Sequence, residues 1–300
     1  MTNKEADIVD LLPKIAELKK CGSFYRTTSQ FQVGGAFKNT RVFGGQSVAQ
    51  AYIAATYYRN DCLPIRMDMT FFGAGAVNKH IDYHAEFNKP ADSMYLQIDA
   101  KQGTKLLNRT SFRLEKKKRI KEGRFTPSAP EFPKNIPLEC PVMQDAIKRI
   151  FIEDWILKFG SSYRLRNTSY DKQIFEMRLP DPYHYTGQTN EIQPLMKLKL
   201  ADKMLVPLLI SDYIVGLPST IVLDQRRIPV KTMASMTHKV HFHSDDFDPF
   251  DDFLVVEHLE NLQGMALLRG QIYTKNGLAI LSYVQQSFFE IDNQLERAKL

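Results

Sequence analysis

An apolar helix followed by four strand-like segments, occurring twice, is the feature that most constrains the fold of this 300-residue chain. In the first half, the alanine-rich segment 46–59 predicts a buried helix whose small residues allow close packing. In the second half, an apolar helix is expected over roughly 205–216, with Pro207 in its first turn and Gly216 at its end. The repeated pattern predicts two α+β halves, each with an antiparallel sheet around a helix.

The strand-like segments are rich in aromatic or β-branched residues and are separated by turn residues. Each set is predicted to form a four-stranded meander, with T-K-N-G at 274–277 as the clearest hairpin turn. Helical periodicity also predicts a leader helix over 4–20 and a helical stretch near 142–158. The expected strands are 66–72, 80–87, 94–101 and 106–115 in the first half, and 231–243, 253–260, 266–274 and 278–290 in the second.

A proline-rich segment lies between the two halves. A basic run gives way there to a stretch with four prolines between Pro127 and Pro137, which is typical of an extended surface linker. We therefore predict an N-terminal unit over 1–114, a linker over 115–141 and a C-terminal unit over 142–300.

The charge of the chain is concentrated in one place. The formal net charge is +6, and K-K-K-R-I-K at 116–121 holds five of the positive side chains. Because the rest is close to neutral, a broad nucleic-acid-binding footprint is not expected. The basic run itself is consistent with a nuclear localisation signal or nucleic-acid patch, with a solvated strand end, or with a contact for the phosphates of an anionic substrate.

Cysteine content and hydropathy indicate the compartment. The three cysteines, Cys21, Cys62 and Cys140, are too few and too widely spaced for a disulfide framework or a zinc site. No apolar run reaches the roughly 18–20 residues that a membrane-spanning helix needs. The sequence therefore predicts a soluble intracellular protein with no membrane span.

Familiar cofactor and nucleophile motifs are missing. The sequence contains no dinucleotide loop, phosphate loop or H-E-x-x-H motif, so no cofactor and no metal are expected. G-Q-S-V-A at 45–49 lacks the last glycine of a nucleophile elbow, which argues against Ser47 as a nucleophile. His241 and His243 share a strand face near His238, and we interpret them as a polar strand face rather than a metal site.

The segment R-V-F-G-G-Q-S-V-A-Q-A at 41–51 resembles the acyl-CoA thioesterase II family, in its bacterial and peroxisomal branches. The resemblance spans roughly residues 23–290 and implies a double hotdog, an α+β fold with two helix-wrapped antiparallel sheets in one chain. The other matching blocks follow in the family's order: T-P-S-A-P at 126–130, S-D-Y-I at 211–214, M-A-S-M-T-H-K-V-H-F-H at 233–243, R-G-Q-I-Y-T-K-N-G at 269–277 and V-Q-Q at 284–286.

The resemblance also implies an activity and a site. Family members hydrolyse fatty acyl-CoA to free fatty acid and CoA, and the matching motifs assign the water-holding roles to Asp212, Ser235 and Gln285. In that reaction Asp212 would act as general base, while Ser235 and Gln285 would fix the water and help the developing oxyanion. We expect direct attack by water rather than a covalent acyl-enzyme.

The residues themselves support these assignments unequally. Asp212 lies in an apolar helix, where a buried carboxylate is costly unless it is functional or paired. By strand parity Ser235 groups with Thr237, so an ordinary exposed serine is equally consistent. Gln285 alternates with apolar residues, and only the V-Q motif selects it over Gln286.

Two glycines and several departures from the family pattern concern substrate binding. Gly44 and Gly45 would let a substrate carbonyl or phosphate approach a helix start, although close packing at a turn explains them equally well. Thr237-His238-Lys239 stands where the family has D-H-S. Two arginines typical of the family are absent from 88–103, which bears on acyl-CoA affinity and chain-length preference.

The ending Ala298-Lys299-Leu300 is similar to the S-K-L peroxisomal address. It predicts binding to the peroxisomal import receptor and a location in the peroxisomal matrix, with the cytoplasm as the alternative. The family resemblance further implies an acyl-CoA substrate and association into a homo-oligomer.

Four functions follow from the sequence, in decreasing order of support. The first is an acyl-CoA thioesterase, and the second is a catalytically silent acyl-CoA-binding or regulatory protein on the same fold. The third is a hotdog hydratase or dehydratase, which would need an acid-base pair such as Asp with His. A nuclear or nucleic-acid-binding protein comes last.

Overall fold

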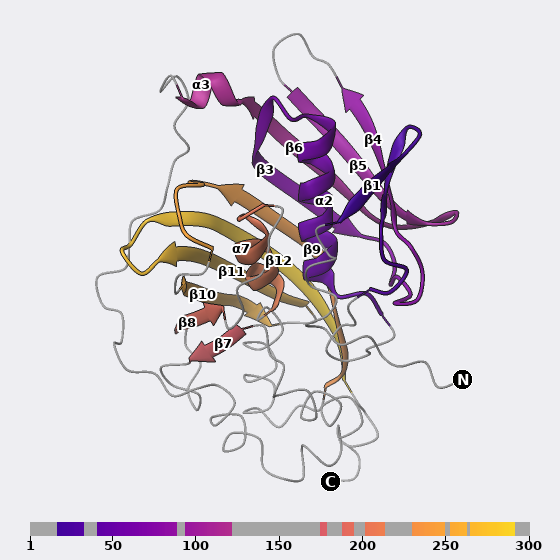
Figure 1. The fold of residues 1–300 in the computed structure, drawn as a ribbon. Helices are drawn as coiled ribbons and strands as arrows, with labels where there is room; N and C mark the ends of the chain where they lie inside the picture. The colour runs from indigo at the N-terminus through magenta and orange to yellow at the C-terminus, as the bar shows by residue number, and fades with distance from the viewer. Residues whose placement is uncertain are drawn as a thin grey trace.

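A computed structural model gives one antiparallel sheet of twelve strands within the described part of the chain (Figure 1). The strand order is β1-β2-β4-β5-β6-β3-β9-β12-β11-β10-β8-β7. The described residues are 17–32, 41–88, 94–121, 202–213, 230–249, 253–262 and 265–291, together with the backbone of 175–178 and 188–194.

Among the described residues, the first half contributes six strands and two helices, and the helix that the sequence predicted over 46–59 is α2. The elements are β1 (Leu18–Cys21), β2 (Phe24–Thr27), α2 (Gly44–Tyr58), β3 (Cys62–Phe71), β4 (Asp82–Asn88), β5 (Met94–Gln102), β6 (Lys105–Lys116) and the short α3 (Lys117–Lys121).

The second half repeats this arrangement around helix α7. Its elements are β7 (Phe175–Arg178), β8 (Gln188–Pro194), α7 (Leu205–Tyr213), β9 (Val230–Phe242), β10 (Phe253–Leu262), β11 (Met265–Thr274) and β12 (Ala279–Ile291). The predicted 274–277 turn joins β11 to β12, where the Thr274 N–H donates to the Leu278 carbonyl at 2.9 Å and Gly277 adopts a φ of 84°. All eight expected strands are therefore present.

The predicted meander is wrong in one respect. In each half the first of the four strands pairs with the last, so β3 lies beside β6 and β9 beside β12. Strands β3 and β9 also pair with each other, which joins the two halves into one sheet. Periodicity along a strand shows which face is buried, but it does not show which strand lies beside it.

The predicted leader helix over 4–20 is also wrong at its end, because residues 18–20 belong to β1. Gly22, with a φ of 62°, makes the tight turn that pairs β1 with β2. This left-handed conformation suits glycine, which has no Cβ to clash. Residues 4–16 and the expected helix near 142–158 lie outside the described residues.

Helices α2 and α7 pack against each other, and each lies against the strands of its own half (Figure 1). Alanines along α2 are fully buried, and Val48 of α2 and Leu208 of α7 belong to one apolar core. The small side chains allow close approach of the helices. No helix among the described residues is long and apolar enough to cross a membrane.

The division into units stays a prediction. Residues 115–121 complete β6 and form α3, whereas 122–141 lie outside the described residues.

Candidate active site

Asp212, Ser235 and Gln285 converge at one point from three elements. Helix α7 carries Asp212, β9 carries Ser235, and β12 carries Gln285. Gln285 Nε2 donates to Asp212 Oδ1 at 2.9 Å and also to Ser235 Oγ, while the Ser235 hydroxyl lies 3.4 Å from the same carboxylate oxygen. The structure thus brings together the three residues that the sequence singled out, and their roles stay a proposal.

The Asp212 carboxyl is held in surroundings that favour its protonated form. It is 9% exposed, and burial raises its pKa to about 6 from a usual value of 3.8. Hydrogen bonds from Gln285, the Gly45 backbone N–H and Ser235 act in the opposite direction. A carboxyl with a pKa near neutrality is suited to general-base work, because it both ionises and accepts a proton readily in that range.

The N-terminus of α2 lies directly against this carboxyl. A Cβ on Gly44 would lie 2.6 Å from Asp212 Oδ2, so only glycine leaves room for the carboxylate at this distance. The partial positive charge of a helix N-terminus stabilises a nearby anion. Close packing against Asp212 therefore accounts for Gly44, and close packing against the Phe43 ring accounts for Gly45. Substrate binding by the two glycines stays a prediction.

Ser235 reaches the site because of a β-bulge that strand parity did not reveal. In the β9–β12 ladder Gln286 pairs with Thr237 and Ser287 pairs with Ser235, which leaves Met236 as the extra residue. A bulge reverses the alternation of side chains beyond it. Ser235 consequently lies on the same face as His238, facing the helices, and the parity that grouped it with Thr237 is wrong.

His238 belongs to the site, although the sequence pointed to it only as a neighbour of other histidines. Its side chain is completely buried, and burial lowers its pKa to about 4, so the imidazole is neutral near pH 7. Nδ1 contacts Gln285 Oε1, and Nε2 lies 3.0 Å from Ser211 Oγ. No spacing rule for strands would have connected His238 with Ser211 on a separate helix.

A second layer of side chains packs against His238. The Tyr283 ring stacks on the imidazole with centroids 5.8 Å apart, and its hydroxyl donates to the buried Glu257 carboxyl. Burial raises the pKa of Glu257 to about 7. A Cβ on Gly270 would lie 2.0 Å from Tyr283 Cζ, so the glycine makes space for the tyrosine.

The other candidate sites gain no support. His241 is exposed on β9, and His243 contacts Ser282. Among the described residues, no group of three or more His, Cys, Asp or Glu side chains could hold a metal ion. Ser47 lies buried inside the first turn of α2 rather than at a strand-to-helix elbow.

Solved structures share this fold over nearly the whole chain. A tesB protein from Mycobacterium avium subspecies paratuberculosis is 16% identical with a TM-score of 0.68, covering 94% of this chain and 98% of that one. Acyl-CoA thioesterase II TesB2 from Mycobacterium marinum is 14% identical with a TM-score of 0.67, covering 93% and 96%. These likenesses confirm the predicted double hotdog fold.

A dehydratase domain has the same fold at a lower similarity. The domain from PpsC of Mycobacterium tuberculosis, in complex with C12:1-CoA, is 10% identical with a TM-score of 0.52, covering 93% of this chain and 99% of that one. No model of a known protein family matches this sequence, and no curated protein matches it.

Proposed function

We propose that this chain hydrolyses acyl-CoA thioesters by direct attack of a water molecule held by Asp212, Ser235 and Gln285. The observation that carries the proposal is the convergence of an amide, a hydroxyl and a helix N-terminus on one buried carboxyl. Carboxyl groups whose pKa values are shifted by burial and by specific partners are typical of catalytic sites. The fold likeness to acyl-CoA thioesterase II structures supports the same activity.

The geometry suggests how the proton and the charge move. Asp212, ionised above about pH 6, accepts a proton from water as the water oxygen forms a bond to the thioester carbonyl carbon. The hydroxyl of Ser235 and the amide of Gln285 orient that water. When the C–S bond breaks, the proton on Asp212 is available to the departing CoA sulfur, which leaves free fatty acid and CoA as products.

The dehydratase alternative needs a histidine that reaches the substrate. Both ring nitrogens of His238 already have partners, in Gln285 and Ser211, and its side chain has no exposed surface. It is therefore placed to support other residues rather than to exchange protons with a substrate. Hydrolysis fits the site better than hydration or dehydration.

The test is release of free CoA from a panel of short- to long-chain acyl-CoAs by wild type, Asp212→Ala and Asp212→Asn. A matched control is Asp68→Asn, since Asp68 is a carboxylate on β3 whose partner is Arg66. We expect release by wild type and the control, and a loss of about 100-fold to 10,000-fold in both Asp212 variants.

Two other results would redirect the proposal. Release that is unaffected by the Asp212 variants would retain the activity and overturn the site. Acyl-CoA binding without any release, by folded protein under conditions in which a known thioesterase is active, would favour the catalytically silent binding protein.

Peroxisomal import and homo-oligomer formation stay predictions. Ala298-Lys299-Leu300 lies outside the described residues. Comparing the location of a fluorescent fusion that keeps this free C-terminus with one that lacks Leu300 would test the import signal.

A further inference from the structure

Gln285 is the centre of the site, and its amide has two ends of nearly equal size. Nε2 supplies hydrogens to Asp212 Oδ1 and Ser235 Oγ, while Oε1 faces His238 Nδ1. A flipped amide would place its oxygen against the carboxylate of Asp212, where two acceptors would repel each other. The network therefore has to determine which end of the amide faces the base.

The tautomer of His238 is coupled to the direction of the Gln285 amide. A neutral imidazole carries one N–H, and the other nitrogen is an acceptor. With the hydrogen on Nδ1, the ring donates to Gln285 Oε1 and holds the amide in the observed direction. With the hydrogen on Nε2, the Nδ1 lone pair would face Oε1 and favour the flipped amide.

The Asp212 end of the chain selects the same tautomer. An ionised carboxylate can only accept, so the Gln285 amide turns Nε2 to Asp212 and Oε1 to His238, where it needs the hydrogen on Nδ1. On the opposite side of the ring, Ser211 Oγ donates to the Leu208 carbonyl at 2.8 Å and lies 3.0 Å from His238 Nε2. In the Nδ1–H tautomer Nε2 is an acceptor that faces this hydroxyl.

The ring itself is fixed in position. Tyr283 stacks on it with an interplanar angle of 20°, and the Tyr283 hydroxyl donates to Glu257. The backbone at Gly270 leaves the space that the tyrosine ring occupies. Because His238 is fully buried, a rotation that exchanged Nδ1 and Nε2 would require these neighbours to move.

We propose that His238 is a positioning residue for the proposed hydrolysis, since its Nδ1–H holds Gln285 Oε1 and thereby directs the amide hydrogens to Asp212 and Ser235. His238 acts through Gln285 and does not contact the reacting atoms. This inference rests on the proposed function for its effect on rate, whereas the hydrogen-bond arrangement holds independently.

The kinetic test compares His238→Leu with His238→Asn. The leucine removes the donor at comparable size, whereas the asparagine places an amide N–H close to the position of Nδ1. We expect His238→Leu to lower kcat about 10–100-fold with little change in KM, as for residues that orient a catalytic group. His238→Asn should recover a substantial part of kcat, and His241→Leu, on the exposed side of the same strand, should match wild type.

A spectroscopic test on wild type does not depend on the variants folding. ¹⁵N NMR of protein labelled at histidine, recorded at about pH 8 where Asp212 is ionised, reports which ring nitrogen carries the hydrogen. We expect the Nδ1–H tautomer for His238, assigned by the loss of its signals in His238→Asn. Ser211→Ala removes the hydroxyl that faces Nε2 but leaves the Asp212–Gln285 end intact, so the Nδ1–H tautomer should persist in this variant.

Three results would overturn the proposal: the Nε2–H tautomer in wild type, unchanged kcat in folded His238→Leu, or no recovery in folded His238→Asn relative to His238→Leu. The NMR result also separates this inference from the proposed function. If wild type released no CoA but His238 showed the Nδ1–H tautomer, the function would fail and the arrangement would stand.

Discussion

The two halves of this chain use the same order of strands around a helix, but they fill the equivalent positions with different chemistry. In the second half, strands β9 and β12 place His238 opposite Gln285. In the first half, the corresponding strands β3 and β6 place Met67 opposite Phe112 and Met69 opposite Thr110. The first half thus has mainly apolar packing where the second half has the polar chain that leads to Asp212.

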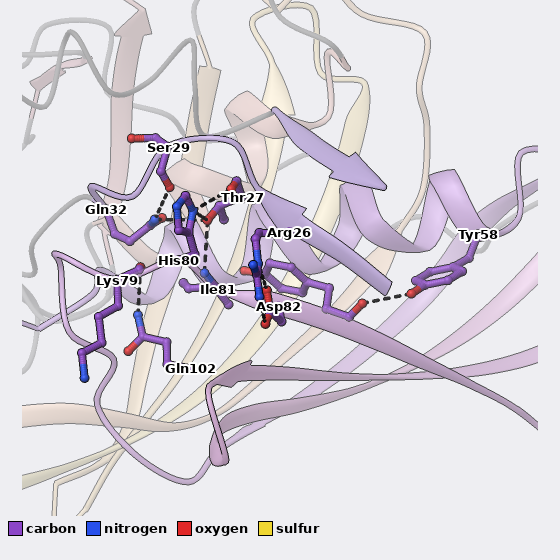
Figure 2. Close-up of polar contacts among 11 residues, drawn as sticks. Arg26, Thr27, Ser29, Gln32, Tyr58, Lys79, His80, Ile81, Asp82 and Gln102 are labelled. Carbon is purple, nitrogen blue, oxygen red and sulfur yellow. Dashed lines mark hydrogen bonds and ion pairs between the residues drawn. The ribbon is translucent and has the colours of Figure 1, made fainter. Parts of the chain in front are cut away.

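Several buried polar groups of the first half bond to one another instead of to a buried carboxyl such as Asp212. Gln50 accepts from the Tyr83 hydroxyl, and Gln46 donates to Gln32. Gln32 in turn contacts Thr27, in the group of polar contacts that Figure 2 shows around His80. The first half contributes to the site through the N-terminus of α2, so the second half holds the proposed base and the first half packs against it.

The largest contrast is expected between two buried glutamines, one from each half. Gln285→Leu removes a donor to Asp212 and should lower kcat about 100–1000-fold. Gln50→Leu leaves Tyr83 without its acceptor, so it should lower stability but change kcat little. Kinetics on folded variants, checked by thermal unfolding, would make this comparison. Equal losses of kcat in Gln285→Leu and Gln50→Leu would contradict the proposal that the catalytic residues belong to the second half.

The next effect concerns how the Asp212 carboxyl links stability to pH. Its folded pKa is raised to about 6, so the folded state holds the proton more tightly than the unfolded chain does. Stability from this group is therefore fully present below about pH 4 and is lost as pH rises through 6. Relative to Asp212→Asn, wild type should lose about 3 kcal/mol of unfolding free energy between acid and neutral pH. Denaturant titrations at several pH values would measure this. If the carboxyl were solvated, the difference in unfolding free energy between wild type and Asp212→Asn would not change with pH.

A smaller effect on stability is expected at Gly270. It pairs with Tyr283 of β12 in the second half, whereas the corresponding strands β5 and β6 of the first half pair Ala100 with Asn108. Gly270→Ala should destabilise the fold by about 1–3 kcal/mol, because its Cβ overlaps the Tyr283 ring. Gly73→Ala is the control, since its Cβ would come close only to the flexible end of Lys105, at 3.1 Å, and would be in ordinary contact with the Leu106 carbonyl at 3.9 Å. Equal unfolding midpoints for the two variants would show that the tyrosine can move aside.

The smallest effect is expected at Gly44, where the start of α2 in the first half packs against Asp212. In Gly44→Ala the new Cβ would push Asp212 Oδ2 away from the start of α2. We expect about a tenfold fall in kcat, as for a slight misplacement of a catalytic group. Gly73→Ala again serves as the control, and the same kcat in both variants would argue against a role of the α2 N-terminus.

Much of the fold and part of the site could be predicted from the sequence. Helices α2 and α7 and eight of the twelve described strands follow from local periodicity, and Asp212 is conspicuous as a carboxylate in an apolar helix. The pairing of β3 with β6 depends on contacts that periodicity does not encode. Ser235 was placed on the wrong face because the bulge at Met236 reverses parity. The sequence pointed to His238 only as a neighbour of other histidines, because its partner Ser211 is brought to it only by the tertiary fold.

The central claim is that one ionised carboxylate, Asp212, drives the reaction. Its most direct test is the pH dependence of kcat/KM for CoA release by wild type, Asp212→Asn and Glu257→Gln. Below about pH 6, wild type and Glu257→Gln should both lose activity about tenfold per pH unit, as the base becomes protonated. Asp212→Asn should show residual activity without that decline. An active Asp212→Asn variant with the wild-type profile would contradict the account.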